Sequence, residues 1–247
     1  MVIAVNTENN DINVISIPRD SMVDSLDEFR RAFEGTSVNV DKMQICLTYS
    51  YGADDDQSSK YTSSAASGLL SGIPIERYCA LDASGLGELA DLAGGVTLEA
   101  LYDVPSTDYL PGEPIAAGQQ VTLRGDDALR YVRYRDEDRF ASALERLERQ
   151  RQFVAALGKK LADELRRNPL KLIDVFRLLQ TRSTTNLGFA DLSYLVSVAA
   201  KMDPDDMDTT RLLGETVKNS DSPWEQYLVD EPSTYQTVLD AFYTRVN

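Results

Sequence analysis

The sequence predicts a layered α/β fold: a single domain over residues 1–247, with a central mixed β-sheet flanked by helices. Three observations lead to this prediction. A strand-like segment at 77–81, a helix-like segment at 84–93 and a second strand-like segment at 96–101 follow one another, which is typical of connections that cross over a sheet. With 43% hydrophobic residues, the chain can bury one full core. Neither an internal repeat nor a linker-like composition divides it.

The chain opens with two β-branched runs, residues 2–5 and 12–17, separated by a turn rich in Asn and Asp. This pattern predicts a β-hairpin. Pro18 follows the second run directly and ends the strand there, because proline cannot donate to the hydrogen-bond ladder. Arg19 and Asp20 are therefore expected at a sheet edge, where functional groups often gather. The alternative is a surface arginine beside a turn aspartate.

The next segments mix clear and ambiguous patterns. Residues 26–33 predict a short helix, and the apolar run 43–47 is compatible with a helix or a strand. Residues 53–67 are rich in Asp and Ser, which predicts an exposed loop leading into a helix that ends near residue 72. Lys42, before the apolar run, is compatible with a solvated surface lysine.

The middle of the chain contains a long connection between regular elements. Ser84 is expected to cap the helix at 84–93, which a glycine pair then closes. Residues 102–120 contain three prolines and predict an irregular connection. A short strand at 121–123 then leads into a helix that starts at Gly125.

The pattern of residues 140–166 predicts a long helix with polar residues at the edge of its apolar face. Six apolar side chains share its core face when successive residues are placed about 100° apart: Phe140, Leu144, Leu147, Val154, Leu161 and Leu165. Arg146 and Gln150 fall on the flank of this face, and Phe153 and Leu157 follow them one and two turns later. Polar groups beside an apolar stripe suit a pocket that holds a charged head with an apolar tail.

The remainder predicts mostly helix. Amphipathic patterns at 170–179 and 189–201 indicate two helices, residues 207–217 include a final strand, and an aromatic-rich helix at 234–243 closes the chain.

Arginine is concentrated in one stretch of an otherwise acidic chain. Residues 124–151 contain 8 of the 18 arginines, although the net charge is −15. An acidic chain repels long polyanions, so a compact group such as a diphosphate is a better partner than nucleic acid. The planar guanidinium donates two parallel hydrogen bonds to phosphate oxygens. The alternative is that Arg146 and Arg149 pair with the glutamates preceding them on a solvated surface.

Composition removes several kinds of chemistry. The chain has no histidine, which excludes Ser-His-Asp hydrolysis, Cys-His proteolysis and zinc sites that need histidine. Its two cysteines, Cys46 and Cys79, lack metal-ligand spacing and are expected to be buried thiols. Carboxylates, arginine, lysine, hydroxyls and an oxygen-bound metal ion remain available.

The start of the chain predicts an excised fragment. No window reaches 18 apolar residues, and neither a basic n-region nor an apolar h-region is present. Because a strand begins at Val2 without a lead-in, we expect an extracytoplasmic fragment whose upstream part is missing.

Five short motifs follow one another over about 130 residues. Residues 14–20 read VISIPRD, Lys42 opens a lysine-led segment, residues 94–96 read GGV, residues 128–135 read ALRYVRYR, and residues 146–150 read RLERQ. In this order they resemble the motifs of the LytR-CpsA-Psr family of Gram-positive cell envelopes. Each motif is weak alone, and the ordered set is specific.

The resemblance implies a phosphotransferase that attaches a polyprenyl-pyrophosphate-linked glycopolymer, of teichoic acid or capsular polysaccharide type, to peptidoglycan. It implies these catalytic residues: Arg19, Asp20, Arg133, Arg135, Arg146 and Gln150. It implies these substrate-binding residues: Lys42, Arg149, Phe153 and Leu157. The last two would border an apolar slot for the isoprenoid.

The resemblance also implies a Mg²⁺ ion, held by aspartates expected upstream of Met1, and therefore no metal ligand in this chain. The family carries an aspartate three positions before Arg146, where this sequence has Ala143. Asp136 and Asp138 are candidates to compensate for it. The expected location is the extracytoplasmic face of the cell membrane, with membrane association through a segment outside this chain. The alternatives are a non-catalytic polyprenyl-phosphate-binding module and a metal-dependent lipid pyrophosphate phosphatase.

Overall fold

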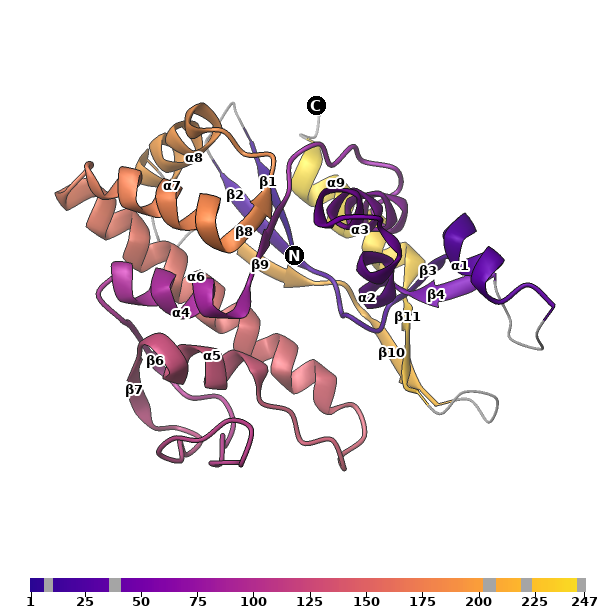
Figure 1. Ribbon diagram of the computed structural model, residues 1–247, viewed down its shortest axis with the longest axis horizontal. Coiled ribbons are helices and arrows are strands. Elements are labelled where there is room, and N and C mark those ends of the chain that lie inside the picture. The colour runs from indigo at the N-terminus through magenta and orange to yellow at the C-terminus, as the bar shows by residue number, and fades with distance from the viewer. Residues whose placement is uncertain (7–10, 36–40, 202–207, 219–223, 244–247) are drawn as a thin grey trace. The chain divides into compact units, whose positions relative to one another are not determined.

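The computed structural model describes residues 1–6, 11–35, 41–201, 208–218 and 224–243. The chain falls into two compact units (Figure 1). Unit 1 consists of Met1–Asn6, Asn13–Cys79 and Thr210–Asn247, and unit 2 consists of Thr7–Ile12 and Ala80–Thr209. The single domain expected over residues 1–247 stays a prediction.

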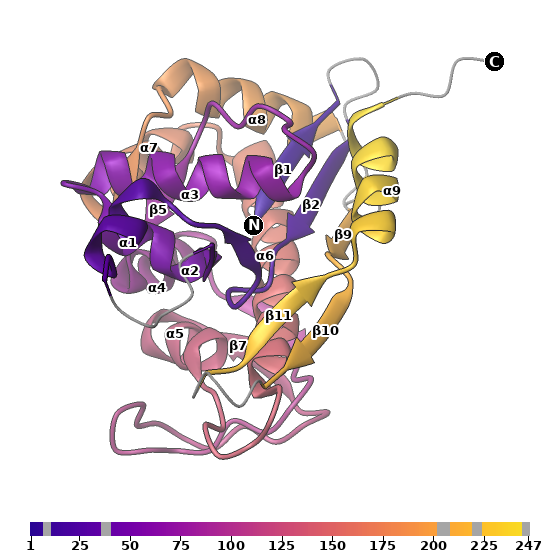
Figure 2. The same ribbon diagram turned by 90° about the vertical axis from the view of Figure 1, so that its right-hand side faces the viewer.

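Small sheets replace the central mixed sheet that the sequence predicted. Among the described residues, one sheet has the order β1-β2-β9, formed by β1 (Val2–Val5), β2 (Ile12–Ser16) and β9 (Asp208–Arg211). Two antiparallel pairs accompany it: β3 (Met22–Asp24) with β4 (Lys42–Gln44), and β10 (Gly214–Val217) with β11 (Gln226–Val229) (Figure 2). β1 and β2 are neighbours, as a hairpin requires, and most of the expected turn, residues 7–10, lies outside the described residues.

The helices of unit 1 are α1 (Asp27–Ala32), α2 (Ile45–Thr48), the 3-10 turn η1 (Tyr49–Tyr51), α3 (Asp55–Leu69) and α9 (Glu231–Phe242). The ambiguous run at 43–47 is both strand and helix, because β4 ends at Gln44 and α2 begins at the next residue. β11 lies in a stretch where the sequence predicted no strand.

The loop predicted at 53–67 is instead largely helix α3. The side chain of Asp54 accepts a 2.8 Å hydrogen bond from Gln57 N and caps the helix. Asp55 and Asp56 occupy the first turn, where the helix dipole favours carboxylates. The aspartates from which the loop was predicted therefore start the helix.

Two apolar clusters form the core of unit 1. One consists of Val23, Phe29, Met43, Ile45 and Ala66, and the other of Ile15, Leu70, Leu212 and Val238. Because Val23 and Met43 are cross-strand partners in β3 and β4, the first cluster fixes the register of this strand pair.

Unit 2 is built mainly of helices: α4 (Ala83–Leu92), α5 (Gly125–Arg133), α6 (Ser142–Arg167), α7 (Lys171–Arg182) and α8 (Phe189–Lys201). Its strand pairs are β6 (Val96–Glu99) with β7 (Gln120–Leu123), and β5 (Cys79–Leu81), which begins at the unit boundary, with β8 (Ser183–Thr185). The long helix α6 extends from α5 to α7 and α8 (Figure 1).

The start of α4 differs from the prediction by its capping residue. Asp82, two residues before the expected Ser84, accepts a 2.6 Å hydrogen bond from Gly85 N. The expected glycine pair does end the helix: Gly94 and Gly95 have φ angles of 80° and 93°, a region that other residues rarely adopt.

The core of unit 2 lies between α4, α5, α6 and the β6-β7 pair. It includes Ala90, Val96, Leu98, Val104, Ile115, Leu123, Ala128, Tyr131, Phe153 and Leu157. Phe140, expected on the core face of the long helix, is 58% exposed because α6 begins only at Ser142.

The expectation of two buried thiols is wrong. Cys46 is half-buried and Cys79 is exposed, and both are free. Cys79 begins the short strand β5. Within the described residues, no helix combines the length and the apolarity needed to cross a bilayer.

Candidate functional site

In unit 1, backbone hydrogen bonds hold the turn that carries Arg19. Ser21 N donates to Pro18 O over 3.0 Å and closes a tight turn directly after β2. Ile45 N donates to Ser21 O over 2.8 Å. Cys46 N donates to Arg19 O over 3.0 Å. These N–H groups belong to the first turn of α2 and have no partner within that helix, so the turn and the helix satisfy each other.

Asp20 is fixed on the other side of the same turn. Tyr227 N, from β11, donates to Asp20 O over 2.8 Å. The Asp20 carboxylate lies 3.4 Å from Gln44 Nε2 and 3.4 Å from Arg19 Nε. Only 14% of the Asp20 side chain is exposed. A largely buried carboxylate is therefore held beside the Arg19 guanidinium.

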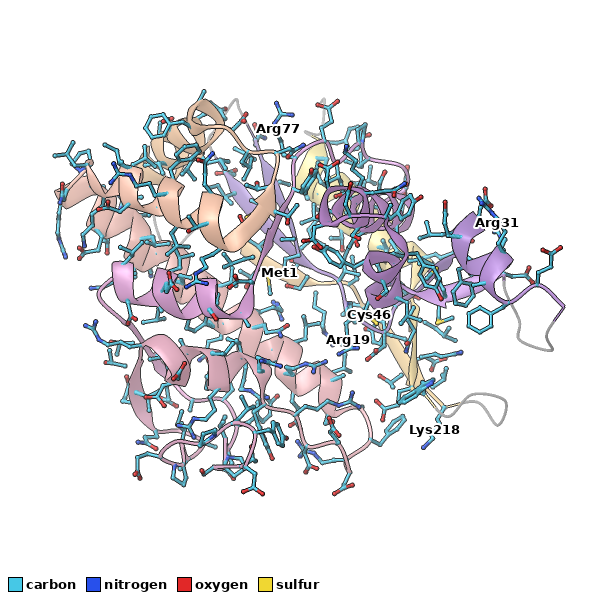
Figure 3. All side chains as sticks on the ribbon, viewed as in Figure 1. Met1, Arg19, Arg31, Cys46, Arg77 and Lys218 are labelled. Atoms are coloured by element: carbon cyan, nitrogen blue, oxygen red, sulfur yellow. The ribbon has the colours of Figure 1, made fainter. Side chains whose placement is uncertain are left out.

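The Arg19 side chain extends from this fixed backbone. Arg19 Nη2 lies 3.6 Å from Cys46 Sγ, and the two residues are neighbours in Figure 3. About half of the side chain, 53%, is exposed. A fixed backbone with a guanidinium that solvent can reach is an arrangement suited to binding an anion.

Lys42 lies on β4, two residues before Gln44, so the two side chains point to the same face of the strand. Lys42 Nζ pairs with Oδ1 of Asp24, its cross-strand partner, over 2.7 Å. This hydrogen bond holds the pKa of Asp24 below its ordinary value. Both side chains are exposed, and an exposed pair contributes about 0 to 1 kcal/mol. A phosphate could therefore displace Asp24 at small cost.

In unit 2, the arginines of the ALRYVRYR segment lie at the end of α5. Arg133 is its last residue and is exposed. No hydrogen bond or ion pair joins the Arg133 side chain to any residue that the structure describes. Arg135 Nε donates to Ser142 Oγ over 3.0 Å, at the first residue of α6. Cations at a helix C-terminus are favourable, because the helix dipole is negative there.

Arg149 of α6 is buried against the same helix end. Its exposed fraction is 2%. Its Nε donates to Tyr131 O over 2.9 Å, and its Nη2 donates to Tyr134 O. Its guanidinium carbon lies 6.0 Å from the ring centroid of Tyr131 and 5.6 Å from that of Tyr134. A third ring, that of Tyr102, is also 6.0 Å away.

Gln150, the next residue, completes this contact. Its Nε2 donates to Val132 O over 3.0 Å. The last carbonyls of a helix have no partner within it, and Arg149 and Gln150 supply donors to carbonyls at this end of α5. The R and Q that end the RLERQ motif therefore dock α6 onto the C-terminus of α5.

The charge of Arg149 is stabilised without a carboxylate. It forms no ion pair with any of the described residues. Burial lowers its pKa from the ordinary value, because the charged form loses its hydration. Burying an ion costs several kcal/mol. Interaction with a helix C-terminus stabilises a cation by up to about 2 kcal/mol, and interaction with desolvated aromatic faces stabilises it by about 2 kcal/mol.

The solvated ion pairs considered as the alternative do not describe Arg149. The two glutamates in question bind other arginines: Glu145 pairs with Arg139, and Glu148 pairs with Arg151 over 2.7 Å. Arg146 lies one turn before Gln150 and is half-buried. Ala143, at the position of the family aspartate, lies in the first turn of α6.

Arg130 and the tyrosines around Arg149 were missed by the sequence analysis. Arg130 is 2% exposed, and its Nη2 contacts Asp127 Oδ1 at 3.1 Å and donates to Glu113 O. It thereby fastens the connection at 102–119 onto α5. The sequence does contain a signal for such contacts, because an arginine and a tyrosine lie within the otherwise apolar run ALRYV. Polar side chains on a buried helix face need hydrogen-bond partners, so their presence there indicates buried polar contacts.

Phe153 and Leu157 were expected to border a slot. Their exposed fractions are 0% and 5%, and both belong to the core of unit 2. An isoprenoid could reach them only if this core opened.

The carboxylates of the candidate site, among the described residues, have partners other than a metal ion. Among the described residues, no group of three or more Asp, Glu or Cys side chains could hold one. Asp20 contacts Arg19 and Gln44, and Asp24 contacts Lys42.

Solved structures share this fold. Bacillus subtilis TagV superposes with a TM-score of 0.74 at 21% identity, covering 98% of this chain and 88% of that chain. TagT bound to LI-WTA superposes with a TM-score of 0.68 at 17% identity, covering 97% of this chain and 81% of that chain. The protein is thus an α/β protein of the same fold class. The profile of the LytR_cpsA_psr family matches residues 1–240, and the chain belongs to that family.

Sequence relatives carry names that state an activity. TagU of Bacillus subtilis (strain 168), a polyisoprenyl-teichoic acid–peptidoglycan teichoic acid transferase, is 24% identical over 195 residues, covering 76% of this chain and 53% of the relative. TagU of Bacillus mycoides (strain KBAB4) is 27% identical over 230 residues, covering 93% and 67%. The chain spans about half the length of the Bacillus subtilis relative.

Proposed function

We propose that the chain is a phosphotransferase that attaches a polyprenyl-pyrophosphate-linked glycopolymer, of teichoic acid or capsular type, to peptidoglycan through a phosphodiester. The observation that carries the proposal is the Arg133 side chain, exposed and without a partner among the described residues, within a family motif at a fixed helix end. The names of the relatives TagU and TagV support the same class of reaction.

The reaction needs charge neutralisation more than covalent chemistry. A hydroxyl oxygen of the peptidoglycan acceptor attacks the phosphorus bound to the glycopolymer. The new P–O bond forms while the bridging P–O bond of the pyrophosphate breaks, and polyprenyl phosphate leaves with the bond's electron pair. The hydroxyl proton passes to a carboxylate, for which Asp20 is the candidate. Arginines and a lysine stabilise the charge on the phosphoryl oxygens.

The residues of this proposal are those of the family motifs. In unit 1, Arg19 would bind a phosphoryl oxygen, Asp20 would accept the proton, and Lys42 would add positive charge. In unit 2, Arg133, Arg135, Arg146 and Gln150 would bind the pyrophosphate. The fixed backbone of the Arg19 turn and the docked end of α5 support these roles, because positioned donors need no reorganisation during the reaction.

The isoprenoid slot, the Mg²⁺ ion and the location belong to the proposal through family membership. A slot beside Phe153 and Leu157 requires that the core of unit 2 open. Mg²⁺, when bound, would neutralise pyrophosphate charge. Action at the extracytoplasmic face of a Gram-positive-type envelope, with a lipid-linked glycan and peptidoglycan as partners, follows from the substrates. A segment outside this chain would supply membrane association.

Ala143 favours a second candidate, a binding module that holds the lipid pyrophosphate without turnover. The family aspartate at this position would place a carboxylate in the first turn of α6, and alanine supplies none. The phosphatase alternative has no structural observation in its favour.

A product assay separates these candidates. The chain with its native flanking segments is incubated with a lipid-linked oligosaccharide, Mg²⁺ and peptidoglycan fragments. The transferase is expected to yield a covalent glycan-peptidoglycan product and polyprenyl phosphate. Binding of the lipid without product would indicate the module. Release of free phosphate would indicate the phosphatase, and both results would contradict the proposed transferase.

A further inference from the structure

We propose that Arg149 is a positioning residue that fixes the end of α5, and with it the side chains of Arg133 and Arg135. This role replaces the substrate contact expected from the sequence. It rests on the proposed function, because the affinity it controls is that for a pyrophosphate.

The hydrogen bonds from α6 reach both sides of Arg133 along the chain. Arg149 donates to the carbonyl oxygens of Tyr131 and Tyr134, and Gln150 donates to that of Val132. These carbonyls belong to residues 131, 132 and 134, which lie on both sides of Arg133. Tyr134 N also donates to Arg130 O over 3.0 Å. The backbone of Arg133 is therefore fixed from both directions.

The guanidinium of Arg149 offers a ligand little access. A direct phosphate ligand must offer free N–H groups, and Arg149 is 2% exposed with three tyrosine rings around its guanidinium. Arg130, equally buried, has Nε and Nη1 without a hydrogen-bond partner. In Arg149, by contrast, Nε and Nη2 both donate to backbone carbonyl oxygens. Two of its three guanidinium nitrogens are therefore engaged by the protein without an anion.

The positive charge of Arg149 is offset at the end of α5. The negative end of the α5 dipole and three carbonyl oxygens lie where three arginines gather. Because the helix dipole and the carbonyl oxygens offset the positive charge of Arg149, Arg149 repels Arg133 and Arg135 less strongly. Arg133 is left as the exposed cation at this end of the helix, and Arg135 is tied to the start of α6 through Ser142.

The test is a double-mutant cycle with farnesyl pyrophosphate as the probe, measured by calorimetry. Arg149→Gln keeps a side chain that can donate to a carbonyl but removes the charge, whereas Arg149→Met removes both. We expect Arg133→Ala to weaken binding at least tenfold, Arg149→Met to weaken it about tenfold and Arg149→Gln less than threefold. The double variant, Arg133→Ala with Arg149→Met, should weaken binding no more than about twofold beyond Arg133→Ala alone, because the second change acts through the first residue.

Arg151→Gln serves as the matched control. Arg151 lies two residues further along α6 and pairs with Glu148 over 2.7 Å, away from the end of α5. It should bind the probe within twofold of the unaltered protein. Two results together would overturn the proposal: Arg149→Gln weakens binding as much as Arg149→Met, and the double variant weakens binding a hundredfold, as the product of the two single losses. They would show that Arg149 is a direct phosphate ligand.

Amide hydrogen exchange gives a second readout that needs no ligand. Arg149→Met should speed exchange at residues 131–136 at least tenfold while leaving α4 within twofold. Unchanged exchange at residues 131–136 would overturn the proposed role of Arg149 in fixing the end of α5, even if binding of the probe weakened. If the unaltered protein does not bind the probe, the proposed function fails together with the role in affinity, whereas the exchange still decides whether Arg149 holds the helix end.

Discussion

Gly112 lies directly against the guanidinium of Arg130: a Cβ built on this glycine would be 2.8 Å from Arg130 Nε. Its φ of 153° also disfavours any other residue. We expect Gly112→Ala to lower the free energy of unfolding by about 2 to 3 kcal/mol, because backbone strain and overpacking add. Urea denaturation measures it.

Gly118 is the matched control on the same connection. Its φ is 79°, and a Cβ there would meet no atom within 4 Å. Gly118→Ala should therefore lower the free energy of unfolding only through backbone strain, by about 1 kcal/mol. Equal losses from both alanines would show that Arg130 does not press against Gly112.

Asp82 should matter more than Ser84 at the start of α4. Asp82 accepts the hydrogen bond from Gly85 N, and loss of such a cap costs about 1 kcal/mol. Asp82→Ala should lower the unfolding free energy by that amount, whereas Ser84→Ala should change it by less than about 0.3 kcal/mol. The reverse order in thermal or urea unfolding would restore Ser84 as the cap.

Tyr131 should make stability depend on alkaline pH. Burial raises the pKa of its hydroxyl in the folded protein above the ordinary value of about 10. The unfolded chain therefore loses this proton first, and stability that is present below pH about 10 falls as pH rises further. Tyr131→Phe should reduce the slope of unfolding free energy against pH between about 9.5 and 11. An unchanged slope would contradict the pKa assignment.

Ala143→Asp should test the departure from the family. A carboxylate in the first turn of α6 interacts favourably with the helix dipole, by about 0.3 to 1 kcal/mol. We expect higher stability and, if this position serves catalysis, a larger yield in the transfer assay at equal lipid affinity. Ala156→Asp, in the middle of the same helix, is the control and should not raise either quantity.

Local chemistry predicted much of the fold. The β-branched runs that became β1 and β2, the glycine pair after α4 and the amphipathic pattern of α8 acted through neighbours in sequence, so their elements could be predicted. The loop expected at α3 failed because Asp54 and its acidic neighbours favour a helix start as well as a turn.

Side-chain roles were harder to predict, because they depend on contacts distant in sequence. The RLERQ motif indicated that Arg149 matters, but its burial depends on Tyr102 and Tyr134, 47 and 15 residues away. Arg130 gave no motif signal of its own, since its partner Glu113 O comes from an irregular connection. The arginine-rich stretch therefore predicted the charge of the site, and the structure separates exposed Arg133 from buried Arg149.

The decisive measurement is the affinity of the unaltered protein and of Arg19→Ala, Arg133→Ala and Arg146→Ala for a polyprenyl pyrophosphate. We expect each variant to remain folded in thermal unfolding and to bind at least tenfold more weakly. Arg31→Ala, an exposed arginine outside the family motifs, should bind normally. Affinities unchanged in the three motif variants would contradict the proposal that these arginines bind pyrophosphate.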